Sequence, residues 1–145
     1  MEDRKIKVLF VCGANSFRSQ VAMTLLNGKY GDRFIGESAG YKLKPISLMA
    51  IKAMAQYGYD IANNPSNRII DIFNQGRVYD YVITVCNEKE ENDCPVFPGS
   101  SFKLHWREFP NPENYQGDEA QKFGQAMYLV EAMEKKIDAF VATVE

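Results

Sequence analysis

The sequence predicts an α/β fold, in which a mostly parallel sheet is flanked by helices in three layers. Apolar runs alternate with helical patterns along the whole chain, which is typical of this class. Two of these runs are apolar at nearly every position, as expected for central strands that helices cover on both faces. The 145 residues suffice for one such core but not for two ordinary ones. We therefore expect a single domain over residues 1–145.

The chain opens with a strand, a loop and a helix. Residues 6–11 are apolar except at Lys7, which predicts the first buried strand. The helix after the loop has one apolar face, formed by Val21, Ala22, Leu25 and Leu26. We expect this helix to end near Asn27-Gly28, a common C-terminal signal, and residues 34–40 to form the second strand.

Two helical patterns separated by a loop come next. Pro45 is expected to open the first of them as a first-turn proline, and Gly58 to end it. The buried stripe of this helix consists of Ile46, Met49, Ala50, Ala53, Met54 and Tyr57. Residues 61–67 are polar and indicate a loop, and residues 68–75 have a short helical pattern.

The second half of the chain holds two more strands and a long helix. Residues 79–86 form a β-branched apolar run, and residues 101–106 fit a last strand. Two prolines and a glycine indicate a loop over residues 108–117. The C-terminal residues 119–144 have one long apolar stripe, which consists of Phe123, Met127, Val130, Met133, Ile137, Val141 and Val144.

Composition and charge exclude several classes of partner. The net charge of −2 provides no basic field for a nucleic acid. No apolar stretch approaches the ~20 residues that a membrane span needs. The first five residues lead directly into a strand without the pattern of a signal peptide. We therefore expect a cytoplasmic protein that binds neither nucleic acids nor membranes.

The stretch from Cys12 to Ser19 indicates a nucleophile at an oxyanion site. The first strand ends in Cys12, a short loop follows, and Arg18 lies where the next helix begins. Backbone N–H groups in such a loop bind a tetrahedral oxyanion. The helix N-terminus and Arg18 both favour the thiolate form of Cys12. We therefore predict that Cys12 attacks a bound oxyanion.

Two further cysteines favour a redox reaction. Cys86 ends the second apolar run, and ligands of parallel sheets bind at the carboxyl ends of the strands, where Cys12 is also expected. A cysteine in a strand is often only a buried apolar residue. The acidic segment and the third thiol, Cys94, favour a thiol relay instead. The spacing of the three cysteines does not fit a paired zinc site, and we expect neither metal nor cofactor.

These residues resemble the low-molecular-weight tyrosine phosphatases and, among them, the thioredoxin-coupled arsenate reductases. The C-x5-R-S element is the signature of the phosphatase loop, with Ala14 in place of a glycine. The added cysteines are what favour the reductases. The matching segments are Cys12–Ser19, Ser38-Ala39-Gly40, Val82–Cys86, Cys94-Pro95, His105-Trp106 and Phe109–Pro112.

The resemblance implies a sheet of four parallel strands in the order 2-1-3-4 and a relay of three thiols. Cys12 would attack arsenate, and Cys86 would attack Cys12, releasing arsenite and forming a disulfide. Cys94 would then attack Cys86, and thioredoxin would reduce the resulting disulfide. Ser19 would stabilise the Cys12 thiolate, and Asn15 would brace the loop. The implied oxyanion site consists of Gly13, Ala14, Asn15, Ser16, Phe17 and Arg18. We expect a monomer.

The general-acid position departs from the family. Asn111 stands where the family has an aspartate, and an amide cannot deliver a proton to a leaving oxygen. Glu108, Glu113 and Asp118 are alternative acids, and no motif favours one of them. Cleavage of a phosphate ester suffers most from this change. A tyrosine phosphatase and a non-catalytic oxyanion or redox sensor are the alternatives to the reductase.

Four further positions carry expectations. Some of the reductases bind potassium through acidic side chains beside the loop, and the matching positions here are Met23 and Asn67. We therefore expect no ion site. His105, the one histidine of the chain, is expected to be structural rather than a base or a metal ligand, and Trp106 is expected to fill the core.

Overall fold

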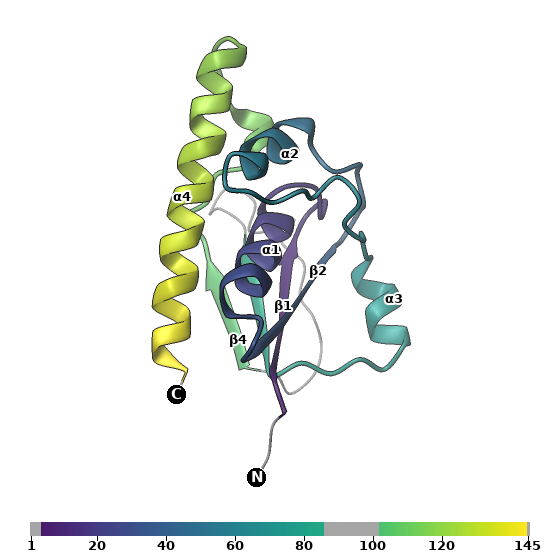
Figure 1. Cartoon of the computed structure of the whole chain (residues 1–145). Coiled ribbons are helices and arrows are strands. Elements are labelled where there is room, and N and C mark those ends of the chain that lie inside the picture. Colours follow the sequence, from purple (N-terminus) through teal and green to yellow (C-terminus); the bar gives the residue numbers. More distant parts are fainter. Residues whose placement is uncertain (1–3, 86–101, 145) are drawn as a thin grey trace.

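A computed structural model of the chain describes residues 4–85 and 102–144, which form a parallel sheet flanked by helices (Figure 1). The four strands of the sheet are β1 (Ile6–Cys12), β2 (Phe34–Gly40), β3 (Tyr81–Val85) and β4 (Phe102–Trp106). The helices are α1 (Arg18–Tyr30), α2 (Leu48–Ala55), α3 (Ile69–Asn74) and α4 (Glu119–Thr143). The strand order is β2-β1-β3-β4, all parallel, which confirms the predicted fold class and topology.

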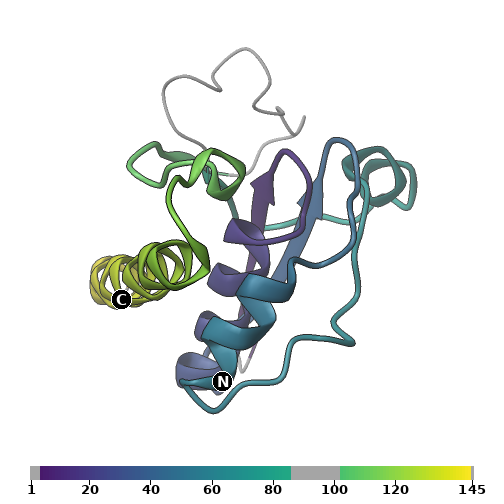
Figure 2. The same ribbon diagram turned by 90° about the horizontal axis from the view of Figure 1, so that it is seen from above.

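Alternating side chains of β1 supply both faces of the sheet. Val8 and Phe10 lie in a large core under α1, α2 and α4. Leu9 and Val11 lie in a second cluster, which includes side chains of α3. All four side chains are fully buried. The run is therefore apolar at successive positions because the strand is buried on both faces, as predicted. Figure 2 shows α1, α2 and α4 together on one side of the sheet.

The long helix α4 packs across α1 through apolar side chains and a polar cluster at the edge. Met133 and Ile137 are fully buried. At the edge of this contact, Asp138 accepts hydrogen bonds from Lys29 Nζ at 2.7 Å and from the Tyr30 hydroxyl at 2.6 Å. These bonds lower the pKa of Asp138 against the opposing effect of its burial, which is the largest single influence.

Two predicted helix boundaries are wrong, the first because of tertiary contacts and the second because of a local helix cap. Helix α1 does not end at Asn27-Gly28 but continues to Tyr30. The Asn27 side chain bonds both the N–H and the C=O of Gly36, at 2.7 and 3.0 Å. A Cβ on Gly28 would lie 2.5 Å from the Tyr59 ring, so this glycine permits a close contact rather than a helix end.

The start of α2 is the second wrong boundary. The helix does not begin at Pro45 but after Ser47, whose Oγ accepts a hydrogen bond from the Ala50 N–H at 3.4 Å. The predicted loop over residues 108–117 contains a short 3-10 helix (Pro112–Asn114), capped by the Asn111 side chain. As expected, Trp106 fills the core, at 5% exposure. None of the helices within the described ranges is both long and apolar enough to cross a bilayer.

Candidate active site

The loop after β1, residues 12–18, is held by its carbonyl groups. Gly13 O accepts hydrogen bonds from the backbone N–H groups of Tyr41 and Lys42, both at 2.9 Å. Ala14 O accepts one from Lys44 N at 3.2 Å. These bonds turn the carbonyl oxygens toward the segment after β2. The opposite ends of the peptide dipoles therefore point into the loop, as an oxyanion site requires.

Asn15 braces this loop from inside. Its φ of 56° lies in the left-handed region, which asparagine tolerates better than most residues. Its Nδ2 donates to Ser19 Oγ at 2.8 Å, and its Oδ1 accepts from the Asn67 N–H at 2.9 Å. The side chain is fully buried, so it supports the loop from behind and does not line the cavity.

The Cys12 sulfur lies within hydrogen-bond distance of two groups at the end of β1. Its Sγ lies 3.0 Å from Ser19 Oγ and 3.3 Å from the Asn15 backbone nitrogen. Because Ser19 Oγ already accepts from Asn15 Nδ2, its own hydrogen is available to Cys12. Donors of this kind hold the sulfur in place at the start of the loop. The geometry is therefore that of a prepared nucleophile.

Arg18 places a positive charge at the start of α1, directly after the loop. It is the first residue of α1 and is 4% exposed, and its Nη1 donates to Phe109 O at 3.2 Å. The dipole of α1 disfavours a cation at its N-terminus, whereas a bound oxyanion would offset both charges. The bond to Phe109 also ties the loop after β4 to the site.

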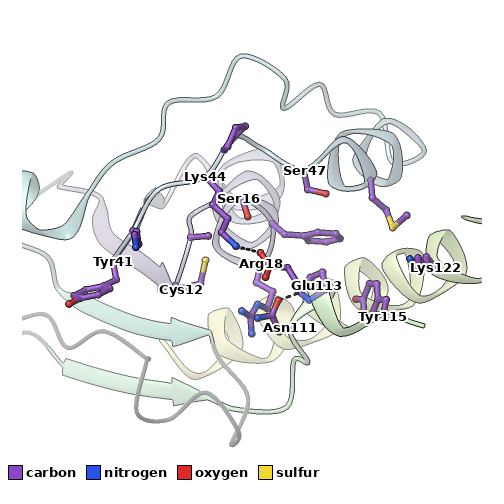
Figure 3. A pocket seen from close by; sticks show the side chains of 17 residues that line it. Cys12, Ser16, Arg18, Tyr41, Lys44, Ser47, Asn111, Glu113, Tyr115 and Lys122 are labelled. Carbon is purple, nitrogen blue, oxygen red and sulfur yellow. Dashed lines mark hydrogen bonds and ion pairs between the residues drawn. The ribbon is translucent and has the colours of Figure 1, made fainter. Parts of the chain in front are cut away.

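A cavity of about 800 Å³ opens over the loop (Figure 3). Its walls come from the loop, the segment around Tyr41 and Lys44, and the 111–115 turn. Lys44 and Glu113 form an ion pair across it. Burial raises the pKa of Tyr115 to about 12, with Arg18 acting in the opposite direction. The Tyr115 hydroxyl is therefore neutral at physiological pH and adds no negative charge to the cavity.

The sequence-predicted site residues fall into three groups. Cys12, Gly13, Ala14, Ser16, Phe17, Arg18 and Asn111 line the cavity. Asn15 and Ser19 lie buried behind it. Cys86 and Cys94 lie outside the described residues, so their positions relative to Cys12 stay a prediction.

His105 lies away from this cavity. Its Nδ1 is 2.6 Å from Thr84 Oγ1, across the β3–β4 pair. This contact agrees with the structural role that was expected for it.

Gln20 is a site residue that the sequence analysis did not single out. It is fully buried, and its Nε2 donates to Asn15 O at 3.2 Å and to Pro65 O at 3.0 Å. Its Oε1 accepts from Asn64 Nδ2 at 3.3 Å. These bonds tie the left-handed turn of the loop to the segment before α3. The available signal was a long polar side chain directly after the R-S pair.

Some of the arsenate reductases that this sequence resembles bind potassium beside the loop. The residues at the matching place in this chain do not fit such an ion. The carbonyl oxygens of Asn15 and Pro65 already accept hydrogen bonds from Gln20. Asn67 donates its backbone N–H to Asn15, and Met23 carries no oxygen ligand. In the described ranges, no three His, Cys, Asp or Glu side chains gather as a metal-binding set.

Replacing Gly40 by alanine should distort the oxyanion loop. A Cβ at this position would lie 2.7 Å from Asn15 N and 2.8 Å from Ala14 C, so the loop backbone must move. Since small displacements in a positioned site have large effects, we expect phosphate affinity to fall about tenfold to a hundredfold by calorimetry. Gly124→Ala is the control, because a Cβ there meets nothing within 4 Å. Unchanged phosphate affinity in Gly40→Ala would show that the loop tolerates the contact.

Comparisons with known proteins agree on one family. Residues 7–145 match the low molecular weight phosphotyrosine protein phosphatase family. Arsenate reductase 2 of Staphylococcus haemolyticus is 35% identical over 119 residues, 81% of this chain and 87% of that protein. Arsenate reductase of Bacillus subtilis is 31% identical over 137 residues, 94% and 95% of the two chains. The crystal structure of arsenate reductase from Archaeoglobus fulgidus has a TM-score of 0.67 at 25% identity, covering 90% and 98%.

Proposed function

This chain belongs to the low molecular weight phosphotyrosine protein phosphatase family, and we propose that it acts as an arsenate reductase. The observation that carries the proposal is the position of Cys12 Sγ, 3.0 Å from Ser19 Oγ in a loop that begins the helix of Arg18. The relatives from Staphylococcus haemolyticus and Bacillus subtilis, both named arsenate reductases, support arsenate as the oxyanion. Cys86 and Cys94 supply the two further thiols that a relay needs.

The first step is a substitution at arsenic. Arsenate binds between the loop N–H groups and Arg18, where positive charge and donors meet. The Cys12 thiolate attacks arsenic, a sulfur–arsenic bond forms, an arsenic–oxygen bond breaks, and the leaving hydroxyl group takes up a proton to become water. Ser19 holds the thiolate by a hydrogen bond until the attack.

The second stage transfers two electrons from thiols to arsenic. The Cys86 thiolate attacks the Cys12 sulfur, the sulfur–arsenic bond breaks, and its electron pair stays on arsenic, which leaves as arsenite. Cys94 then attacks Cys86 and frees the Cys12 thiolate. Thioredoxin reduces the Cys86–Cys94 disulfide. We assign these steps to one monomeric domain over residues 1–145, working in a reducing compartment such as the cytoplasm.

Arsenate turnover coupled to a thioredoxin system tests this proposal. The reduced protein should oxidise NADPH in the presence of arsenate, thioredoxin and thioredoxin reductase. Cys94→Ser should release about one arsenite per chain and then stop, because its disulfide cannot move to thioredoxin. Glutathione with glutaredoxin, in a parallel reaction, should support little turnover. Full thioredoxin-linked turnover by Cys94→Ser would contradict the relay.

Hydrolysis of aryl phosphates is a second candidate activity. The cavity of about 800 Å³ is much larger than an oxyanion needs, and Phe17, Tyr41 and Tyr115 contribute aromatic walls. An ester has a poor leaving group that needs a proton, and Asn111 cannot supply it, so this activity requires another acid in the cavity. Hydrolysis of p-nitrophenyl phosphate that survives the loss of Cys86 and Cys94 would favour the phosphatase.

A further inference from the structure

Asn111 cannot act as an acid, and its amide has a structural task in this chain. Its Oδ1 accepts a hydrogen bond from the Glu113 N–H at 3.0 Å, which caps the 3-10 helix Pro112–Asn114. The cap places Glu113 directly after the proline, on the wall of the cavity above Cys12. Among the described residues that line this cavity, Glu113 is the one with a carboxyl group.

The other two candidate acids, Glu108 and Asp118, have partners outside the cavity. Glu108 Oε2 lies 2.8 Å from Lys136 Nζ and does not line the cavity. Asp118 caps α4, because its Oδ1 accepts from the Gln121 N–H at 2.8 Å. Of the three acids that the sequence left open, Glu113 is therefore the one that the fold brings to the cavity lined by Cys12.

We propose that Glu113 is the catalytic acid of this site and protonates the oxygen that leaves arsenic. The inference rests on the proposed function. In the step, the sulfur–arsenic bond forms at Cys12, an arsenic–oxygen bond breaks, and the proton of the Glu113 carboxyl group passes to the leaving oxygen. Water departs, Glu113 is left as a carboxylate, and arsenic keeps its oxidation state until Cys86 attacks.

Lys44 is the partner of this carboxylate. Figure 3 shows the Lys44 side chain extending across the cavity to Glu113, with their ion pair drawn between them. The ammonium group stabilises the carboxylate that remains after proton transfer. Both side chains are about half exposed, 54% and 56%, so solvent can restore the proton between turnovers.

Single-turnover release of arsenite from the reduced protein, without thioredoxin, tests the assignment. Glu113→Gln should release arsenite about a hundredfold more slowly, the usual scale of a lost general acid. It should also lose the dependence of the rate on pH that the acid causes. Glu108→Gln is the matched control and should stay within about twofold of the wild type, because its partner lies outside the cavity. Asn111→Asp added to Glu113→Gln should restore at least about tenfold.

A second variant separates proton donation from the ion pair. Lys44→Met breaks the pair but keeps the acid, so it should slow release by less than Glu113→Gln does. Equal losses in the two variants would assign the effect to the pair and overturn the proposal, as would wild-type rates in Glu113→Gln. A wild-type protein that releases no arsenite would instead contradict the proposed function, and the acid assigned to that reaction with it.

Discussion

Arsenate reduction is expected to fall below detection, by more than about 10⁴-fold, when Cys12 is replaced by serine. A serine hydroxyl is a far weaker nucleophile than a thiolate, and it cannot form the disulfide that carries the electrons away. The replacement is nearly isosteric, so the contacts to Ser19 and the Asn15 N–H should persist. Turnover with thioredoxin and single-turnover arsenite release both measure the loss.

Oxyanion binding by Cys12→Ser is the control for this result. A neutral hydroxyl replaces a negative sulfur beside the anion, so phosphate should bind as tightly as to the wild type or more tightly. Calorimetry with phosphate measures this directly. Loss of both turnover and binding would mean that the substitution has disrupted the loop and not only removed the nucleophile.

Replacing Ser19 by alanine removes one hydrogen bond to the Cys12 sulfur. We expect the rate of Cys12 alkylation to fall by only about fivefold to thirtyfold.

The central strands were predictable because a short stretch of sequence is enough to show that a strand is buried on both faces. A strand that is buried on both faces must be apolar at successive positions, and residues 8–11 of β1 meet that condition. The end of α1 was not predictable in this way. Asn27 and Gly28 look like a local stop signal, but they serve contacts with Gly36 and Tyr59, which lie outside the helix. A local pattern does not distinguish a helix end from a close tertiary contact.

The candidate site also has a part that the sequence predicts and a part that depends on tertiary contacts. The oxyanion loop is one contiguous motif, so its residues are near each other in the sequence as well as in space. Gln20, Lys44 and Glu113 matter through contacts that only the fold creates. Lys44 and Glu113, for example, are 69 positions apart and meet across the cavity. The sequence left three acids open on the loop after β4, and the orientation of the 111–115 turn is what singles out one of them.

Arsenate turnover should fall about 10²–10³-fold in kcat/KM when Arg18 is replaced by lysine. The guanidinium is planar and offers two parallel donors to an oxyanion, whereas an ammonium acts as a point charge. Arg18 is 4% exposed and donates to Phe109 O at 3.2 Å, so burial and this bond hold its position. A lysine ammonium group cannot donate to Phe109 O and to the oxyanion with the same geometry. Phosphate affinity should fall with turnover, since the ground-state anion uses the same donors.

The variant Lys42→Gln tests whether the loss of kcat/KM in Arg18→Lys comes from the position of the guanidinium or from the total charge of the cavity. Lys42 also lines the cavity and carries the same charge, but its side chain is exposed. Exposed charges are screened by water and salt, so its loss should lower kcat/KM only a few-fold, and less at high ionic strength. The loss in Arg18→Lys should instead be nearly independent of salt. Equal effects in the two variants would mean that the cavity attracts arsenate by its summed charge and that Arg18 has no special place in the loop.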